Sequence, residues 1–277
     1  MPQKPLDRLS TLIRRFRVEA RVAREGFAGD PGADVAPNLF VVRQGRISWP
    51  ESGAADGGTM DAPALVFFPR GPAGARLQVS AGAEFVAARV DLGGAINPVA
   101  LALPERVTIP LTISDPLRAI ADLLLGEVLS PRCGGGAVID RLAEVLVIRL
   151  LRHVIESGEA KVGLLAGLAH PRLSAALVAI HDHPERDWQL DNMAAEAAMS
   201  RTHFATTFRD VVGVPPGEYL SGWRLTLTRA DIARGKPLKA IARSVGFSGP
   251  AALSRAFSRR YGISPRQAQT AAHARDA

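Results

Sequence analysis

The feature that most constrains this chain is a pattern that occurs twice near its end. Residues 194–216 read AAEAAMSRTHFATTFRDVVGVPP, and residues 240–265 read AIARSVGFSGPAALSRAFSRRYGISP. Each copy has a short apolar stretch, a break, a longer stretch with two large apolar residues four positions apart, and a Gly-x-x-Pro ending. In chain order, Met193-Ala194, Met199, Phe204, Phe208, Gly213 and Pro216 match Ile241-Ala242, Phe247, Leu253, Phe257, Gly262 and Pro265. The offset is 48 residues before the break and 49 after it, so the second break holds one extra residue.

Each copy predicts two helices joined by a tight turn, at about residues 190–212 and 238–261. A small residue, Ala194 or Ala242, stands where the second helix crosses closely, and the second helix leaves its polar face free. This is the plan of a helix-turn-helix unit, whose second helix enters the DNA major groove. A helix over residues 217–234 joins the two units, and its 18 residues span about 27 Å. The repeat therefore predicts contacts with two consecutive turns of the major groove, which lie roughly 34 Å apart.

The positive charge of the chain is concentrated where the repeat lies. Residues 170–277 hold 15 Lys and Arg against nine Asp and Glu, whereas residues 1–169 hold 19 against 18. A basic domain favours nucleic acid over a membrane surface as its partner, although a generally basic proteome gives the same excess. One cysteine, Cys133, excludes an internal disulfide framework and a multi-cysteine zinc site. The sequence has no 18-residue apolar run and no signal-peptide core, so we expect a cytoplasmic protein that does not enter the membrane.

The sequence pattern predicts three regions along the 277 residues. Residues 1–100 contain short strands between Gly- and Pro-rich turns and predict an all-β barrel or double sheet, including a hairpin over residues 38–49. Residues 101–169 predict a helical segment for dimerisation and linkage, and residues 170–277 the DNA-binding domain. The helix predicted over residues 137–157 is apolar around most of its circumference, so either a second copy or the C-terminal domain must cover it. We favour a homodimer with Leu146 inside the interface.

Residues 171–266 resemble the DNA-binding domain of AraC/XylS-type transcription regulators. The stretches MSRTHFATTFRDVVGVPPGEYLSGWRLTLTRADI and IARSVGFSGPAALSRAFSRRYGISPRQ carry the resemblance. The front half is similar to the cupin-like sensor domain of one subgroup, through its strand pattern and the turn FFPRG. The resemblance implies an α+β protein with an N-terminal cupin-like β barrel plus helical pair, followed by an all-α C-terminal domain with two helix-turn-helix units. It also implies a sequence-specific regulator that binds promoter DNA, works with RNA polymerase and responds to a small-molecule effector.

Three residues depart from the pattern of the family. Ala198 stands where the first turn usually has Gly, so an L-residue is expected at positive φ at a cost of about 1 kcal/mol. Pro237 replaces the usual hydroxyl cap, and Pro250 opens the second recognition helix, where proline is tolerated in the first turn.

By residue-wise resemblance, both recognition helices present side chains to base edges. These are Arg201, Thr202, Ala205 and Thr206 in the first helix, and Ala251, Ala252 and Arg255 in the second. Arg255 is the candidate for bidentate readout of guanine, with a phosphate contact or an internal salt bridge as the alternative. Arg209, Arg259 and Arg260 are expected to contact phosphates, which position the protein without reading sequence. The apolar helical setting of Trp188, Tyr219 and Trp223 favours core packing over base stacking.

The alternative function is a cupin-type enzyme fused to an accessory DNA-binding module. Catalytic cupins generally hold a metal with histidines, and the first 152 residues contain no histidine, so we expect no metal, cofactor or catalytic residue. His181 and His183 are two positions apart, point to different helix faces, and are expected to be exposed. An effector cavity remains, and its candidate lining is Phe40, Val42, Trp49 and Phe67, with Arg43 or Arg89 for an acidic ligand. Core packing explains these residues equally well.

Overall fold

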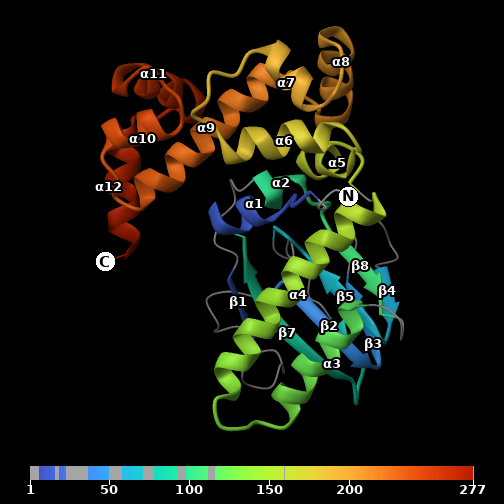
Figure 1. Cartoon of the computed structure of the whole chain (residues 1–277). Helices are drawn as coiled ribbons and strands as arrows, with labels where there is room; N and C mark the ends of the chain where they lie inside the picture. Colours follow the sequence, from blue (N-terminus) through green and yellow to red (C-terminus); the bar gives the residue numbers. More distant parts are fainter. Residues whose placement is uncertain are drawn as a thin grey trace. The chain divides into compact units, whose positions relative to one another are not determined.

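The computed structural model describes residues 6–15, 19–22, 37–49, 58–70, 78–92, 98–111, 116–158 and 160–276. They form a mixed helix-and-sheet protein (Figure 1). The chain divides into two compact units: a β unit, residues 17–157, and a helical unit, residues 1–16 together with 158–277. In this division residues 101–157 group with the strands and residues 158–169 with the C-terminal helices. The functional boundaries predicted for the three regions stay predictions.

The described strands of the β unit form two antiparallel sheets. They are β1 (Glu19–Val22), β2 (Leu39–Gln44), β3 (Arg46–Trp49), β4 (Gly58–Asp61), β5 (Ala64–Phe67), β6 (Gln78–Val79), β7 (Glu84–Asp91) and β8 (Val107–Pro110). One sheet has the order β1-β7-β2-β5-β8 and the other β4-β3-β6. The described strands therefore form a double sheet and not the closed barrel that the resemblance implied.

The hairpin predicted over residues 38–49 is wrong. β2 pairs with β5 and β7, whereas β3 pairs with β4 and β6, so consecutive strands belong to different sheets. Gly45 joins them with φ at 101°, and a Cβ there would lie 2.7 Å from both the Ala83 Cβ and the Ser80 Oγ. Two alternating runs around a glycine look the same in sequence whether the chain turns back or crosses to another sheet. Only the pairing partners distinguish the two cases.

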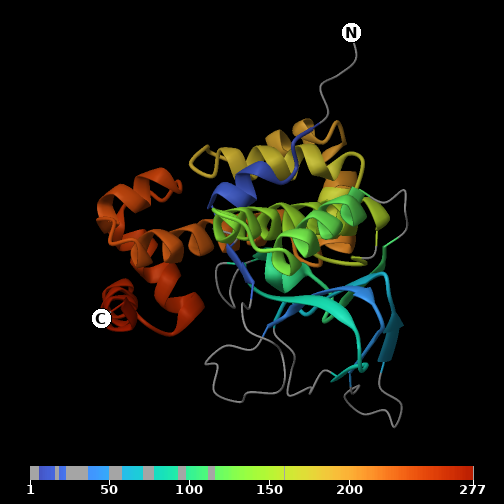
Figure 2. The same cartoon turned by 90° about the horizontal axis from the view of Figure 1, so that it is seen from below.

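The two faces of the larger sheet have different neighbours. The face that carries Phe40, Val42 and Val66 packs with Ile47 and Trp49 of the smaller sheet to form an apolar core. The opposite face lies against α3 (Pro116–Leu129) and α4 (Gly135–Ser157), as both views show (Figures 1 and 2). A short helix, α2 (Pro98–Ala102), precedes β8.

The structure corrects the position predicted for Leu146. Its side chain is fully buried within the β unit, together with Val147 and Leu150 of the same helix. The large apolar side chains that α3 and α4 leave exposed include Leu123, Val138 and Val145. Periodicity located the apolar helix correctly but did not show which of its sides the sheet covers.

The helical unit consists of α1 and the helices that follow α4. They are α1 (Ser10–Arg15), α5 (Leu164–Ala169), α6 (Leu173–Asp182), α7 (Leu190–Glu196), α8 (Arg201–Val212), α9 (Pro216–Ala233), α10 (Leu238–Ser244), α11 (Pro250–Tyr261) and α12 (Pro265–Asp276). The helix predicted over residues 217–234 is confirmed as α9. α5 was not predicted. None of the described helices has the length and apolarity needed to cross a bilayer.

Local signals explain the ends of the two longer helices of the repeat. The Ser200 side chain accepts a hydrogen bond from the His203 N–H and caps α8, and Pro250 occupies the first turn of α11. Gly213 and Gly262 end these helices with φ at 87° and 72°, a left-handed conformation that glycine adopts without a steric cost. Gly213 and Gly262, which match in the two copies, therefore end their helices in the same way, whereas the two helices begin differently.

Candidate nucleic-acid interface

The breaks in the two copies fold into the same turn. Ala198 has φ at 50° and Gly246 has φ at 81°, and each donates its N–H to the carbonyl three residues earlier. The next residue, Met199 or Phe247, donates its N–H five residues back, over 3.0 Å or 2.9 Å. The positive φ predicted for Ala198 is confirmed. The turns place α7 against α8 and α10 against α11, as two helix pairs joined by α9 (Figure 1).

α8 buries one side and presents the other to solvent. Phe204 and Phe208 are fully buried and their rings pack 5.4 Å apart between centroids. Of the residues predicted to face DNA, Arg201, Thr202, Thr206 and Arg209 are exposed, and Ala205 is half-buried. Arg201 lies 3.4 Å from a carboxylate oxygen of Asp191, and both side chains are well exposed, so the ion pair contributes little to stability.

α11 repeats this arrangement with more positive charge. Leu253 and Phe257 are fully buried, whereas Ala251, Arg255, Arg259 and Arg260 are exposed and Ala252 is half-buried. Within the part of the chain that the structure describes, no side-chain hydrogen bond or ion pair holds these three arginines. Their guanidinium groups are therefore available to an anionic partner.

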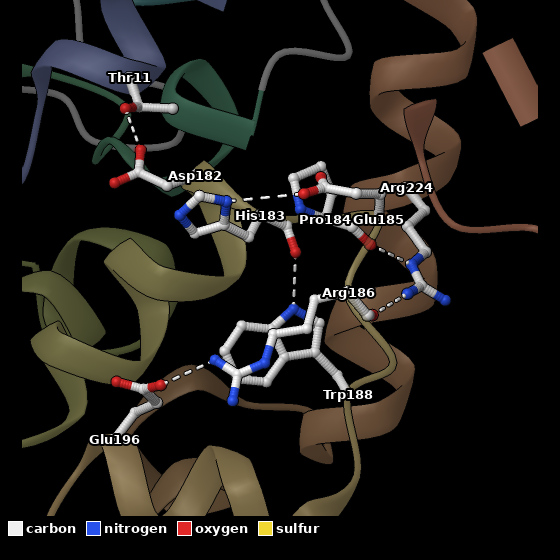
Figure 3. A network of polar contacts seen from close by, with 9 residues as sticks. All are labelled: Thr11, Asp182, His183, Pro184, Glu185, Arg186, Trp188, Glu196 and Arg224. Carbon is white, nitrogen blue, oxygen red and sulfur yellow. Dashed lines mark hydrogen bonds and ion pairs between the residues drawn. The ribbon is translucent and has the colours of Figure 1, made fainter. Parts of the chain in front are cut away.

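The connector between α6 and α7, residues 183–189, is held by side chains that bind its backbone (Figure 3). The Trp188 Nε1–H donates to the His183 carbonyl over 2.8 Å, and Arg224 of α9 donates to the carbonyls of Pro184 and Arg186 over 2.8 Å and 2.9 Å. The Arg186 side chain lies over the Trp188 ring and donates to Glu196 of α7 over 3.0 Å. These contacts tie the connector to α9 and to the last residue of α7.

The three aromatic side chains considered for base stacking pack inside the helical unit, as predicted. Trp188 and Trp223 are buried, and Tyr219 packs against Phe208 with 5.5 Å between ring centroids. Burial raises the pKa of the Tyr219 phenol, so its oxygen keeps its proton and can donate a hydrogen bond. Base stacking by these residues finds no support in their positions.

The exposure predicted for His181 is wrong. Its side chain is buried, its Nε2 lies 2.7 Å from the Tyr219 hydroxyl, and its ring lies 4.3 Å from the Trp223 ring. Burial, with a smaller contribution from the charge of Arg15, lowers the pKa of His181 to about 3. His183 is exposed as expected. His183 follows the last residue of α6, whereas His181 lies on the side of α6 that Tyr219 and Trp223 of α9 cover.

The candidate cavity residues of the β unit do not come together. Phe40, Val42 and Trp49 meet in the core between the sheets. Phe67 pairs with Leu39 and lies on the opposite face of the sheet, because side chains alternate along β5. Two further candidates are exposed: Arg43, whose Nε donates to Glu84 over 2.6 Å, and Arg89 on β7. Among the described residues, no cluster of His, Cys, Asp and Glu is arranged to hold a metal ion.

Comparisons with known proteins match both units. A helix-turn-helix domain family matches residues 193–271, and a cupin family matches residues 7–156, just over half of the chain. An AraC-like transcription regulator of Streptomyces antibioticus is 42% identical over 130 residues, 46% of this chain and 43% of that protein. An HTH-type transcriptional regulator of Haemophilus influenzae is 33% identical over 166 residues, 60% of this chain and 55% of that protein. The chain thus spans about half the length of these curated relatives.

Among solved structures, the DNA-binding domain of AdpA in complex with a target DNA is 28% identical. The match covers 38% of this chain and 96% of that one, with a TM-score of 0.36.

Proposed function

The chain belongs to the AraC-type regulators that join a cupin domain to a helix-turn-helix domain, and on that premise we propose that it is a sequence-specific, DNA-binding regulator of transcription. The observation that carries the proposal is the pair of matched turns at Ala198 and Gly246, each followed by a helix with a buried apolar side and an exposed basic side. One such pair is an ordinary helical hairpin. Two helix pairs with the same turn and the same division into buried and exposed sides favour two copies of one DNA-binding motif.

We propose that α7–α8 and α10–α11 are helix-turn-helix units, with α8 and α11 as the recognition helices. α9 has 18 residues and is therefore about 27 Å long. That length suits two helices that enter consecutive turns of the major groove on one side of the duplex, roughly 34 Å apart. Double-stranded promoter DNA is accordingly the proposed partner, and RNA polymerase a second one.

The exposed side chains divide into two proposed roles. Base readout is assigned to Arg201, Thr202, Ala205, Thr206, Ala251, Ala252 and Arg255, and phosphate contact to Arg209, Arg259 and Arg260. Arg255 is on the exposed side of α11, two residues before the buried Phe257, where its planar guanidinium can bind guanine O6 and N7. Arg260 lies near the end of α11, where a helix leaves the groove and meets the DNA backbone.

The two roles are separable by substitution. Arg255→Ala is expected to lose about 1–3 kcal/mol of binding free energy on a duplex that the wild-type chain selects from a random pool, and to discriminate less at one base position. Arg260→Ala is expected to bind selected and random duplexes more weakly by the same factor. The slope of its log affinity against log salt concentration should fall by about one ion. Both are measured by anisotropy titrations at several salt concentrations. Equal losses for Arg255→Ala on both duplexes would refute base readout, and a wild-type chain that binds no duplex would refute the function itself.

We further propose that the chain forms a homodimer through the exposed side of α3 and α4. Val138 and Val145 are seven residues apart on α4, so they lie on one side of that helix, and both are more than 40% exposed. Leu123 adds an apolar side chain from α3, which packs beside α4 and leaves this leucine 59% exposed. Exposed apolar side chains on two neighbouring helices favour a protein partner, and a second copy supplies the same side chains.

The β unit is proposed to sense a small molecule in the cytoplasm. Trp49 is central to its core, and its buried Nε1 has no hydrogen-bond partner among the described residues. An acceptor on a ligand would satisfy this donor. The other two tryptophans of the chain lie in the helical unit, so a Trp188→Phe/Trp223→Phe variant reports this site by fluorescence. Ligands that raise the melting temperature without changing Trp49 emission would argue against this site.

The relatives' names describe regulators, and the enzyme alternative finds no support among them.

A further inference from the structure

One arginine of α9 contacts both halves of the helical unit. Arg224 lies at the middle of α9, and its guanidinium is half-buried. Its Nε donates to the Pro184 carbonyl and one terminal nitrogen donates to the Arg186 carbonyl, so a single planar group binds the connector at two points (Figure 3). Burial lowers the pKa of Arg224, while the nearby carboxylates of Asp187 and Glu185 act in the opposite direction.

The first contact continues into the first helix pair. The Arg186 residue whose carbonyl Arg224 holds also donates its own side chain to Glu196 near the end of α7. The Trp188 indole closes the same connector onto the His183 carbonyl. A displacement of Arg224 would therefore be transmitted through a hydrogen-bonded connector to α7, and from α7 to α8.

The second contact is with the turn of the second helix pair. A Cβ at Gly246 would lie 2.7 Å from an Arg224 terminal nitrogen, 2.9 Å from its Cζ and 2.9 Å from the Glu185 Cα. Real Cβ atoms do not approach other atoms so closely, so the absence of a side chain at Gly246 lets this turn rest directly on Arg224 and on the connector. Glycine is therefore favoured at position 246 for two reasons: it leaves room for Arg224, and it adopts the positive φ of 81° without strain. At Ala198 an alanine occupies the equivalent position.

From these contacts we infer that Arg224 is a positioning residue that sets the orientation of the two helix pairs relative to each other. The inference rests on the proposed function, because fixed pairs would fix the spacing between the two DNA segments that α8 and α11 contact. Both hydrogen-bond acceptors are carbonyls on one chain segment, so a guanidinium with two parallel donors suits them. A lysine carries its three donors on one freely rotating ammonium nitrogen, so it lacks the two parallel, rigidly spaced donors that hold both carbonyls in one geometry.

The experiment measures spacing preference on DNA. The wild-type chain first selects a duplex from a random pool, and footprinting defines its two contacted segments. Variants of this duplex then carry zero, one or two extra base pairs between the segments. The wild type is expected to lose affinity sharply with each insertion. Arg224→Lys, which keeps the positive charge, is expected to bind the original spacing about tenfold more weakly and to discriminate the spacings much less.

Each alternative leaves a different result. If Arg224→Lys binds all duplexes as the wild type does, Arg224 acts through charge alone and the inference is wrong. If its affinity falls equally for every spacing, the residue supports the fold without setting the orientation, and the inference is again wrong. A wild-type chain that selects no duplex would instead refute the proposed function.

Gly246→Ala tests the second contact against a matched control. Gly235 has a similar φ of 73°, but a Cβ there meets nothing within 4 Å. Gly235→Ala therefore carries the backbone strain without the clash with Arg224. Gly246→Ala is expected to relax the spacing preference as Arg224→Lys does, whereas Gly235→Ala should leave it unchanged. A relaxed preference in both alanine variants would show that strain, and not the contact with Arg224, is responsible.

Discussion

Ala198 is the one described residue other than glycine with a positive φ, and its replacement tests how much strain the first turn holds. An L-residue in the left-handed region is disfavoured by roughly 1–2 kcal/mol relative to its usual conformations. Glycine removes this strain but also gives the unfolded chain more freedom, which offsets about 0.5–1 kcal/mol. The Ala198 side chain is exposed, so the substitution removes no core contact. Ala198→Gly is expected to stabilise the helical unit by about 0.5–1 kcal/mol.

Ala195→Gly is the matched control. Ala195 is also exposed and lies three residues earlier, inside α7, where glycine costs about 0.5–1 kcal/mol relative to alanine. Both variants replace alanine with glycine, so the change in the unfolded chain is similar in both. The difference between them, about 1–2 kcal/mol, therefore measures the strain in the folded turn.

The assay is urea unfolding followed by tryptophan fluorescence in a Trp49→Phe background. Trp188 and Trp223 then report the helical unit alone. With a typical dependence of about 2 kcal/mol per molar urea, the two variants should differ in midpoint by roughly 0.5–1 M. If Ala198→Gly destabilises the unit as much as Ala195→Gly does, Ala198 is not strained and the reasoning is wrong.

Two further predictions concern titration and assembly. The pKa of His181 is lowered to about 3 from an ordinary 6.5. Between these values the unfolded chain binds a proton at His181 and the folded chain does not. The stability that neutral His181 contributes is therefore complete above about pH 6.5 and is lost as the pH falls towards 3, by about 1.4 kcal/mol per pH unit. His181→Gln should therefore flatten the acid side of a plot of urea midpoint against pH, and an unchanged slope would mean that another group controls it. Val145→Glu places a charge on the exposed side of α4 and should raise the dimer dissociation constant about tenfold or more in sedimentation, with an unchanged circular dichroism spectrum. A Val145→Glu chain that stays fully dimeric would place the interface elsewhere. Leu146→Glu is the contrasting variant, because it places the charge at a buried position and should unfold the β unit.

The sequence determined the helical unit in most of its detail, because local signals specify it. Glycines at positions 213 and 262, prolines at 216 and 250, and apolar residues four apart fix where helices end and which side they bury. The strain at Ala198 was predictable too, since a turn of known geometry leaves an L-residue no other conformation. The exposed arginines of α11 followed from the same periodicity, because the buried Leu253 and Phe257 define the opposite side.

Only the tertiary structure decided which element covers which. His181 is buried because α9 packs on its side of α6, and nothing within ten residues of it in the sequence indicates this. Gly45 separates strands of different sheets, and Phe67 lies on the opposite face from Phe40, because strand pairing depends on partners far along the chain. The contact of Arg224 with residues 184–186 and with Gly246 likewise spans some 20 to 40 residues in each direction. A sequence pattern records the chemistry of each residue and its near neighbours, but long-range packing selects among the surfaces that this pattern leaves equivalent.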